Sequence, residues 1–267
     1  MRRTVPVLVY HSVCTDPAPL MRDWAITPDG FREHLAFLAS EGYTTLTVSE
    51  YAQRLRAPAW SLPPRTAVIT FDDGFADFAT AAAPALAEAG MTATLYVSSA
   101  YMGETSSWLG PEGEQPMLTW SQIADVAAAG IEIGAHAHHH FALDELDRAS
   151  AQIEIVRSKN LIEDHLGTPV ESFAYPHGYH SRAIKEMVRL AGFTSACGVK
   201  HALSGPGDDL FALARIMVPA DATTHDLGAL ISGLSRAPRH ERLKTKAWRA
   251  VRRARTRRDP RVAAGHV

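Results

Sequence analysis

The chain has 267 residues, of which 46% are hydrophobic and 21% charged, and its formal net charge at pH 7 is −2. This length accommodates one large α/β domain or two small ones, and the apolar share suffices for a substantial core. No run approaches the ~20 apolar residues of a membrane span. The two cysteines, Cys14 and Cys197, exclude a disulfide framework but leave a single bridge open.

The charge is distributed unevenly along the chain. Residues 235–267 contain 12 Lys or Arg and two acidic residues, whereas the other 234 residues contain 15 basic and 27 acidic ones. This pattern predicts a single acidic globular domain over residues 1–234 and a basic, Arg-rich tail over residues 235–267, helical or disordered. We expect no nucleic-acid binding, because no reading motif accompanies the tail. Peripheral contact of the tail with an anionic membrane and a merely solvated tail are the two open alternatives.

The amino terminus lacks the pattern of a secreted protein. Its apolar stretch covers only residues 5–10, which is too short for the hydrophobic region of a signal peptide. The sequence therefore predicts a cytoplasmic protein, peripheral to the inner membrane face if the tail binds lipid.

Short apolar runs alternate with amphipathic segments along the chain. One predicted helix starts at Thr27-Pro28. Four others cover residues 79–88, 120–129, 144–166 and 181–191. This alternation predicts βαβ units and a parallel sheet, and seven or eight units favour a single-domain (β/α)7–8 barrel. In such a barrel, sites gather at the carboxyl ends of the strands. The predicted strands are residues 5–11, 44–47, 67–73, 93–99, 131–136, 172–176, 194–199 and 213–218.

Two adjacent aspartates, Asp72 and Asp73, end the third predicted strand. Adjacent carboxylates repel each other unless a cation or a proton separates them. Because successive side chains of a strand point to opposite faces, the strand end must twist if both aspartates face one site. The alternative interpretation is a solvated Asp-Asp-Gly turn that ends at Gly74.

A histidine cluster, His136 and His138 to His140, follows the fifth predicted strand. Carboxylate oxygen together with imidazole nitrogen is the ligand set of a catalytic zinc site. His136 and His140 can face one metal if the chain turns helically after the strand, and His138 then points elsewhere. His139 competes with His140 as a ligand, and a solvated polar turn is the alternative to any metal site.

Two further strands end in residues that could serve the same site. Residues 173–179 end in Pro-His-Gly-Tyr, and their glycine allows a backbone N–H to approach a ligand closely, although a plain turn is the alternative. His11 ends the first strand and would share the barrel rim with the carboxylates. Tyr175, Tyr179 and Trp120 are candidates for stacking on a sugar, but lone aromatic residues are more often part of the core.

Together these segments resemble the polysaccharide deacetylases of carbohydrate esterase family 4. Residues 70–74, Thr-Phe-Asp-Asp-Gly, match the first family motif in full. Residues 136–140 match the second, except that Ala137 replaces the usual Ser or Thr. Residues 173–178 look like the third motif, with His177 in the usual Tyr position. The resemblance implies the distorted (β/α)7–8 barrel of these enzymes.

The resemblance also implies roles for individual residues. Asp73, His136 and His140 would bind a divalent metal, usually zinc. Asp72 would be the general base toward a water molecule. The backbone N–H of His177 would join the metal in stabilising the oxyanion.

Two positions depart from the better-known members of the family. An arginine of the third motif tethers the base in those members, but Ala174 stands in its place here. Arg215 is the candidate replacement. The motif that supplies the general acid is not found after Arg215, whereas in circularly permuted members this acid is a histidine of the first strand. His11 is therefore the predicted acid, and His177 is the alternative.

The resemblance implies a hydrolase of carbon–nitrogen bonds that removes acetyl groups from N-acetylated sugars. The substrate could be a polysaccharide, an oligosaccharide, a glycan precursor or a glycosylated metabolite. One alternative is another metal-dependent amide or ester hydrolase on the same scaffold, such as a deformylase, an O-deacetylase or a cyclic amidase. The other is an inactive sugar-binding module, against which the intact motif residues argue.

Overall fold

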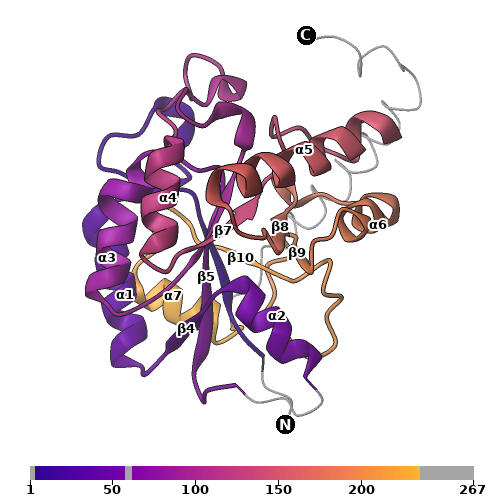
Figure 1. Ribbon diagram of the computed structural model, residues 1–267. Helices are drawn as coiled ribbons and strands as arrows, with labels where there is room; N and C mark the ends of the chain where they lie inside the picture. Colours follow the sequence, from indigo (N-terminus) through magenta and orange to yellow (C-terminus); the bar gives the residue numbers. More distant parts are fainter. Residues whose placement is uncertain (1–3, 58–61, 235–267) are drawn as a thin grey trace.

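A curled parallel sheet forms the centre of the protein. The computed structural model describes residues 4–57 and 62–234, so the predicted basic tail lies outside the described residues. The strand order is β10-β1-β5-β6-β7-β8-β9, and β4 pairs with the first half of β5 (Figure 1). These strands are β1 Val7–Tyr10, β4 Thr44–Leu46, β5 Thr66–Phe71, β6 Thr94–Val97, β7 Glu132–Ala135, β8 Ser172–Ala174, β9 Ser195–Cys197 and β10 Ile216–Met217.

The sheet curls until its two edges approach each other. All strand pairs along it are parallel. Leu213, which precedes β10 at one edge, forms a parallel bridge with Cys197 in β9 at the other edge. The sheet is therefore the distorted barrel that the sequence predicts, and all eight predicted strands are present. The sequence gives no sign of the short pair β2 (Ser12–Val13) and β3 (Ala25–Ile26).

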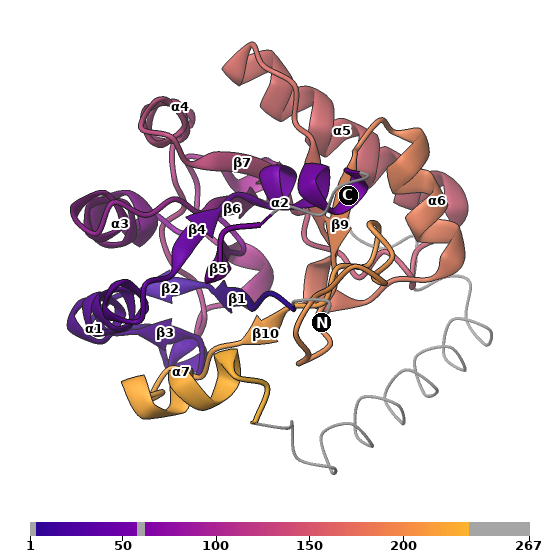
Figure 2. The ribbon, with the colours of Figure 1, turned by 90° about the horizontal axis from the view of Figure 1, so that it is seen from below.

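Most helices surround the outside of the sheet, with α1, α3 and α4 on one flank and α5 and α6 on the other (Figures 1 and 2). By contrast, α2 crosses the amino-terminal end of the strands (Figure 2), where its first N–H groups bond to Thr94 and Glu132. No helix among the described residues is long and apolar enough to cross a membrane. The helices are α1 Pro28–Ser40, α2 Val48–Arg56, α3 Ala83–Glu88, α4 Trp120–Ala128, α5 Arg148–Leu166, α6 Arg182–Leu190 and α7 Thr224–Ile231.

Several helix predictions need correction. The sequence pattern did not predict α2 and α7, although Thr47 and Thr223 form capping boxes at their starts. The helix predicted over residues 144–166 begins at Arg148, because the Asp147 carboxylate accepts hydrogen bonds from two first-turn amides. The helix predicted over residues 79–88 consists of a π-helical turn at Phe78–Ala82 followed by α3.

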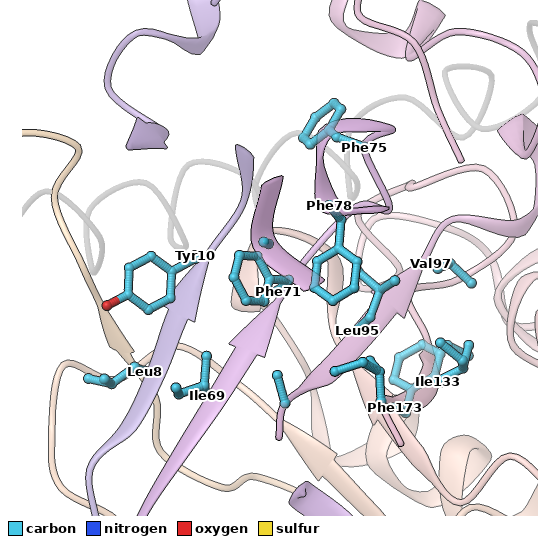
Figure 3. Close-up of a cluster of buried hydrophobic side chains, with 14 of the residues drawn as sticks. Leu8, Tyr10, Ile69, Phe71, Phe75, Phe78, Leu95, Val97, Ile133 and Phe173 are labelled. Atoms are coloured by element: carbon cyan, nitrogen blue, oxygen red, sulfur yellow. The ribbon is translucent and has the colours of Figure 1, made fainter. Parts of the chain in front are cut away.

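Strand alternation divides the core into two layers. Outward side chains such as Leu8, Ile69 and Phe71 pack beneath the surrounding helices (Figure 3). Inward side chains fill the barrel and meet α2; this inner cluster comprises Val5, Val7, Leu46, Val48, Tyr51, Val68, Tyr96, Ala174, Cys197 and Leu213. Both cysteines are free. Because successive side chains of a strand point to opposite faces, Asp72 lies on the same inner face as Val68 and Thr70.

Gly134 in β7 lets the Tyr96 ring cross the barrel interior. A Cβ at this position would lie 2.5 Å from two Tyr96 ring carbons and 2.8 Å from Ser172 Oγ. We therefore expect Gly134→Ala to lower the free energy of unfolding by about 1–3 kcal/mol through overpacking, as measured by urea denaturation. Gly207→Ala is the control, because no atom lies within 4 Å of its added Cβ. Equal stability of the two variants would contradict this account.

Candidate metal centre

The two aspartates face one site because the backbone turns sharply after β5. Asp72 continues the inward face of the strand, and Asp73 adopts a left-handed backbone conformation, with φ 77°. This conformation is uncommon for a residue other than glycine. It turns the Asp73 side chain toward the interior instead of the outer face. Gly74 follows with φ 94°, so the motif needs its glycine to complete the turn.

His136 and His140 approach Asp73 from the end of β7. The Nδ1 of His136 donates a hydrogen bond to the carbonyl oxygen of Ala174 at 2.8 Å, which directs Nε2 toward the carboxylates. The distance from this Nε2 to Asp73 Oδ1 is 3.4 Å, and the Nε2 of His140 lies 3.1 Å from the same oxygen. One oxygen and two nitrogens therefore converge on one point.

Asp73, His136 and His140 fit a divalent cation. Their ligand atoms lie within 4.8 Å of one another, and all three residues are buried. Asp73 Oδ1 is buried yet has no hydrogen-bond partner of acceptable geometry among the described residues. One carboxylate and two imidazoles with a fourth position open is a donor set typical of catalytic zinc.

The protonation states of these residues also suit a metal. Burial lowers the pKa of His136 to about 4, so its imidazole is neutral at pH 7, as a metal ligand must be. Burial alone would raise the pKa of Asp73, but His140 and the other nearby histidines reverse this effect and lower it. The carboxylate is therefore ionised.

The other two histidines of the cluster turn away from this point. His138 Nδ1 lies 2.8 Å from Ser99 Oγ, and His139 Nδ1 donates to Glu154 Oε1 at 2.7 Å. The geometry thus favours His140 over its competitor His139 as a ligand.

Arg215 binds Asp72 through two parallel hydrogen bonds. Its Nη1 donates to Oδ1 at 2.6 Å and its Nη2 to Oδ2 at 2.8 Å, and the guanidinium is fully buried. Burial alone would raise the pKa of Asp72, but the Arg215 charge outweighs it and lowers this pKa. The arginine that Ala174 cannot provide is thus replaced from the segment before β10. The Asp72 carboxylate also borders the triad, with Oδ2 3.9 Å from His136 Nε2.

His11 and His177 lie at the rim of the centre. His11 is half-buried and directly follows Tyr10, whose carbonyl oxygen accepts a hydrogen bond from the Asp72 N–H at 3.0 Å, which places His11 beside the two aspartates. His177 is exposed, has φ 59°, and its ring centroid lies 4.7 Å from that of His140. Both histidines are therefore near the centre, and geometry alone does not choose between them.

The three aromatic residues proposed for sugar stacking differ in their surroundings. Tyr175 is buried and donates to the carbonyl oxygen of Phe211, so it cannot stack on a sugar. Trp120 is half-buried, and His165 covers one face of its ring at 4.0 Å. Tyr179 lies 6.3 Å from His177 between ring centroids.

Two tryptophans that no sequence motif indicated lie beside the centre. The Trp24 ring is 5.2 Å from His11 and the Trp108 ring is 5.1 Å from His140. Their loops are joined by a hydrogen bond from Leu20 N–H to the Glu112 carbonyl. Both tryptophans lie outside the regular strands and longer helices, so no periodic pattern marks them.

Comparison of the sequence with models of protein families identifies the family of this chain. The model described as "Polysaccharide deacetylase" matches residues 61–196, just over half of the chain. The chain belongs to the polysaccharide deacetylase family. This membership makes it a member of a hydrolase family that acts on acetylated carbohydrates, and it confirms the family resemblance seen in the motifs.

One curated protein and several solved structures are similar to this member of the polysaccharide deacetylase family. "Putative polysaccharide deacetylase YxkH" of Bacillus subtilis (strain 168) is 25% identical over 233 residues, which cover 86% of this chain and 77% of YxkH. A structure of the Streptococcus pyogenes deacetylase PplD has a TM-score of 0.75 at 20% identity, covering 86% of this chain and 99% of PplD. IcaB from Ammonifex degensii gives 0.71 at 24% identity, covering 85% and 97%. These structures share the fold.

The contribution of the buried Arg215–Asp72 ion pair to stability can be tested by removing the Arg215 charge. Arg215→Met leaves a buried carboxylate without its counterion, so we expect the free energy of unfolding to fall by about 3–5 kcal/mol at neutral pH. Arg65→Met is the control, because the Arg65–Glu41 pair is exposed and its loss costs at most about 1 kcal/mol.

The pH dependence of this loss has a defined sign. In the native protein the pKa of Asp72 lies below its ordinary value of 3.8, so the pair contributes stability above that pH and loses it on acidification. In Arg215→Met, burial dominates and raises this pKa, so the carboxylate destabilises the fold as the pH rises. The stability deficit should therefore be larger at about pH 7 than at about pH 4.5. A deficit independent of pH would contradict this assignment.

Proposed function

We propose that the protein is a metal-dependent deacetylase that removes acetyl groups from N-acetylated sugars. The observation that carries this proposal is the buried Asp73, His136 and His140 triad beside an Asp72 held by Arg215. The triad would hold a divalent cation, and zinc best matches its donor set. When bound, such a cation polarises an acyl carbonyl and can lower the pKa of a water molecule to about 7.

Asp72 is proposed as the general base. The Arg215 guanidinium fixes the orientation of its carboxylate and keeps it ionised at neutral pH. A base held in one rotamer beside the triad can accept the proton of an attacking water without reorganisation. Arg215 acts on the reaction only through Asp72 and is a positioning residue.

His11 is proposed as the general acid, which donates a proton to the departing nitrogen. An amine is a poor leaving group unless it is protonated, whereas an alkoxide of an ester needs less help. A histidine at the rim beside both aspartates therefore supports an amide substrate over an ester. The backbone N–H of His177 is proposed to donate to the oxyanion, and its left-handed backbone is consistent with a specialised loop.

The indoles of Trp24 and Trp108 support a carbohydrate substrate. Trp24 is 43% exposed and neighbours the proposed acid, so its ring face is available for stacking on a sugar. The structure of the related PplD is described as a complex with acetate, the product that deacetylation would release here.

The experiment that tests the function is a screen of N-acetylated oligosaccharides and glycosides for acetate release, with and without a chelator. We expect chelator-sensitive release of acetate together with a free amino sugar. Release of formate, a ring-opened product or acetate from O-acetyl esters alone would replace the proposal with another acyl hydrolase. Sugar binding with no turnover in the metal-loaded protein would indicate an inactive binding module.

Variants of the two neighbouring aspartates should separate metal binding from catalysis. We expect Asp73→Ala to lose both the metal and the activity, because it removes the only carboxylate ligand of the triad. Asp72→Asn should retain the metal but lose turnover by about 10²–10⁴-fold, the usual contribution of a general base. Metal content is measured by elemental analysis of the same samples. Full metal occupancy in Asp73→Ala, or near-normal turnover in Asp72→Asn, would refute the corresponding role.

The acid assignment predicts a dependence on the leaving group. His11→Ala should reduce turnover of an N-acetyl sugar by about 10²–10⁴-fold, but it should affect an aryl acetate far less, because a phenolate leaves without protonation. The measurement is the ratio of the two rates in wild type, His11→Ala and His177→Ala. If only His177→Ala shows the selective loss, then His177 is the acid.

A further inference from the structure

The loop from His136 to His140 provides two of the three proposed ligands in an unfavourable backbone conformation. Ala137 has φ 62° and His140 has φ 59°, both in the left-handed region that residues with a Cβ rarely adopt. Such a conformation persists only when surrounding contacts enforce it. The contacts that hold this loop therefore determine where the ligand nitrogen of His140 lies relative to that of His136.

The carbonyl groups of the loop are held from the end of β6. Four consecutive residues there, 98–101, bond to the four consecutive carbonyl oxygens of residues 136–139. Ser98 Oγ donates to the first at 3.3 Å and Tyr101 Oη to the last at 3.4 Å. The backbone N–H groups of Ser99 and Ala100 donate to the two between them. This row of contacts fixes one side of the loop.

The amide groups of the loop are held by Glu154 in α5. Its Oε2 accepts hydrogen bonds from the backbone N–H of His138 at 3.1 Å and of His139 at 2.7 Å. Its Oε1 accepts from His139 Nδ1 at 2.7 Å. Glu154 is only 6% exposed, so it is a buried acid whose described partners all lie in this loop.

We propose that Glu154 is a positioning residue that sets the metal affinity of the centre by fixing the loop between His136 and His140. The inference rests on the proposed metal-binding function. Ala137 has no side-chain hydrogen-bonding group, and the loop amides that follow it bond to Glu154, which lies in α5 15 residues after His139. The buried carboxylate thus gives the loop a support that does not come from its own side chains.

The test compares Glu154→Ala with Glu163→Ala. Glu163 lies in the same helix and also binds a backbone amide, that of Val170, together with Lys159, but it lies outside the metal centre. The measurement is the Kd for Zn²⁺ of each metal-free protein, by competition with a chromophoric chelator well below its melting temperature. We expect Glu154→Ala to bind zinc about 10–100-fold more weakly, as is usual for outer-shell partners of metal ligands. Glu163→Ala should bind as wild type does.

Two further variants distinguish positioning from a general loss of stability. Glu154→Asp keeps the charge but withdraws the carboxylate from the loop amides, so it should weaken zinc binding; it also replaces Glu154→Ala if that variant does not fold. Glu154→Gln retains an acceptor oxygen at the right length and should recover most of the affinity. The visible spectrum of the Co²⁺-substituted proteins, which reports ligand geometry, should change in the first and return toward wild type in the second.

The outcomes separate this inference from the proposed function. If wild type binds no zinc, the proposed metal-dependent function fails. If wild type binds zinc and Glu154→Ala or Glu154→Asp binds it equally tightly, the function stands and the role of Glu154 is overturned. Equal weakening in Glu154→Ala and Glu163→Ala would also overturn it, because the effect would then be a general consequence of damaging α5.

Discussion

The ion pair between Arg215 and Asp72 is the interaction on which the rest of the site depends. Both groups are withdrawn from water, and such burial is unfavourable unless each charge is paired and fully hydrogen-bonded. Asp72 binds both terminal nitrogens of the guanidinium, and Arg215 also donates to Thr70 Oγ1 and the Gly198 carbonyl. The Tyr96 ring lies 5.5 Å from the guanidinium carbon and adds a favourable face to the cation.

This ion pair spans strands that are not neighbours. In the sheet order β1 separates β5, which leads to Asp72, from β10, which Arg215 precedes, so the Arg215 side chain spans the interior of the curled sheet to reach Asp72. The same curl brings Asp73 toward the histidines that follow β7. The apolar residues below the pair fill the barrel, and α2 covers its amino-terminal end. A tightly packed base therefore supports a polar site at the carboxyl end of the strands.

Several residues of the site have unusual backbone conformations. Asp73, His140 and His177 are all in the left-handed region, although none is a glycine. Each deviation costs free energy that the surrounding fold must offset. In the His136-to-His140 loop this support comes from residues 98–101 and from Glu154, which together satisfy the loop's carbonyl and amide groups. Rigid support of this kind lets a metal centre hold its ligands before the cation arrives.

The sequence by itself determined the strand order along the chain, the family, and the residues that end each strand. These features are local, because an apolar run, a terminal glycine or a Thr-Phe-Asp-Asp-Gly motif can be recognised without knowing what lies opposite. The choice of His140 over His139 was not local, since it depends on a left-handed turn at Ala137 and on a carboxylate from α5. Glu154, Trp24 and Trp108 carry no sequence signal because their partners lie on other elements.

Arg215 falls between these two cases. The sequence suggested Arg215 only because Ala174 stands where the better-known members of the family have an arginine. Only the tertiary structure decided that its guanidinium reaches Asp72, because the two side chains come from segments far apart in the sequence that both point into the barrel. The sequence specifies which side chains each strand end provides, and the closure of the barrel determines which of them meet.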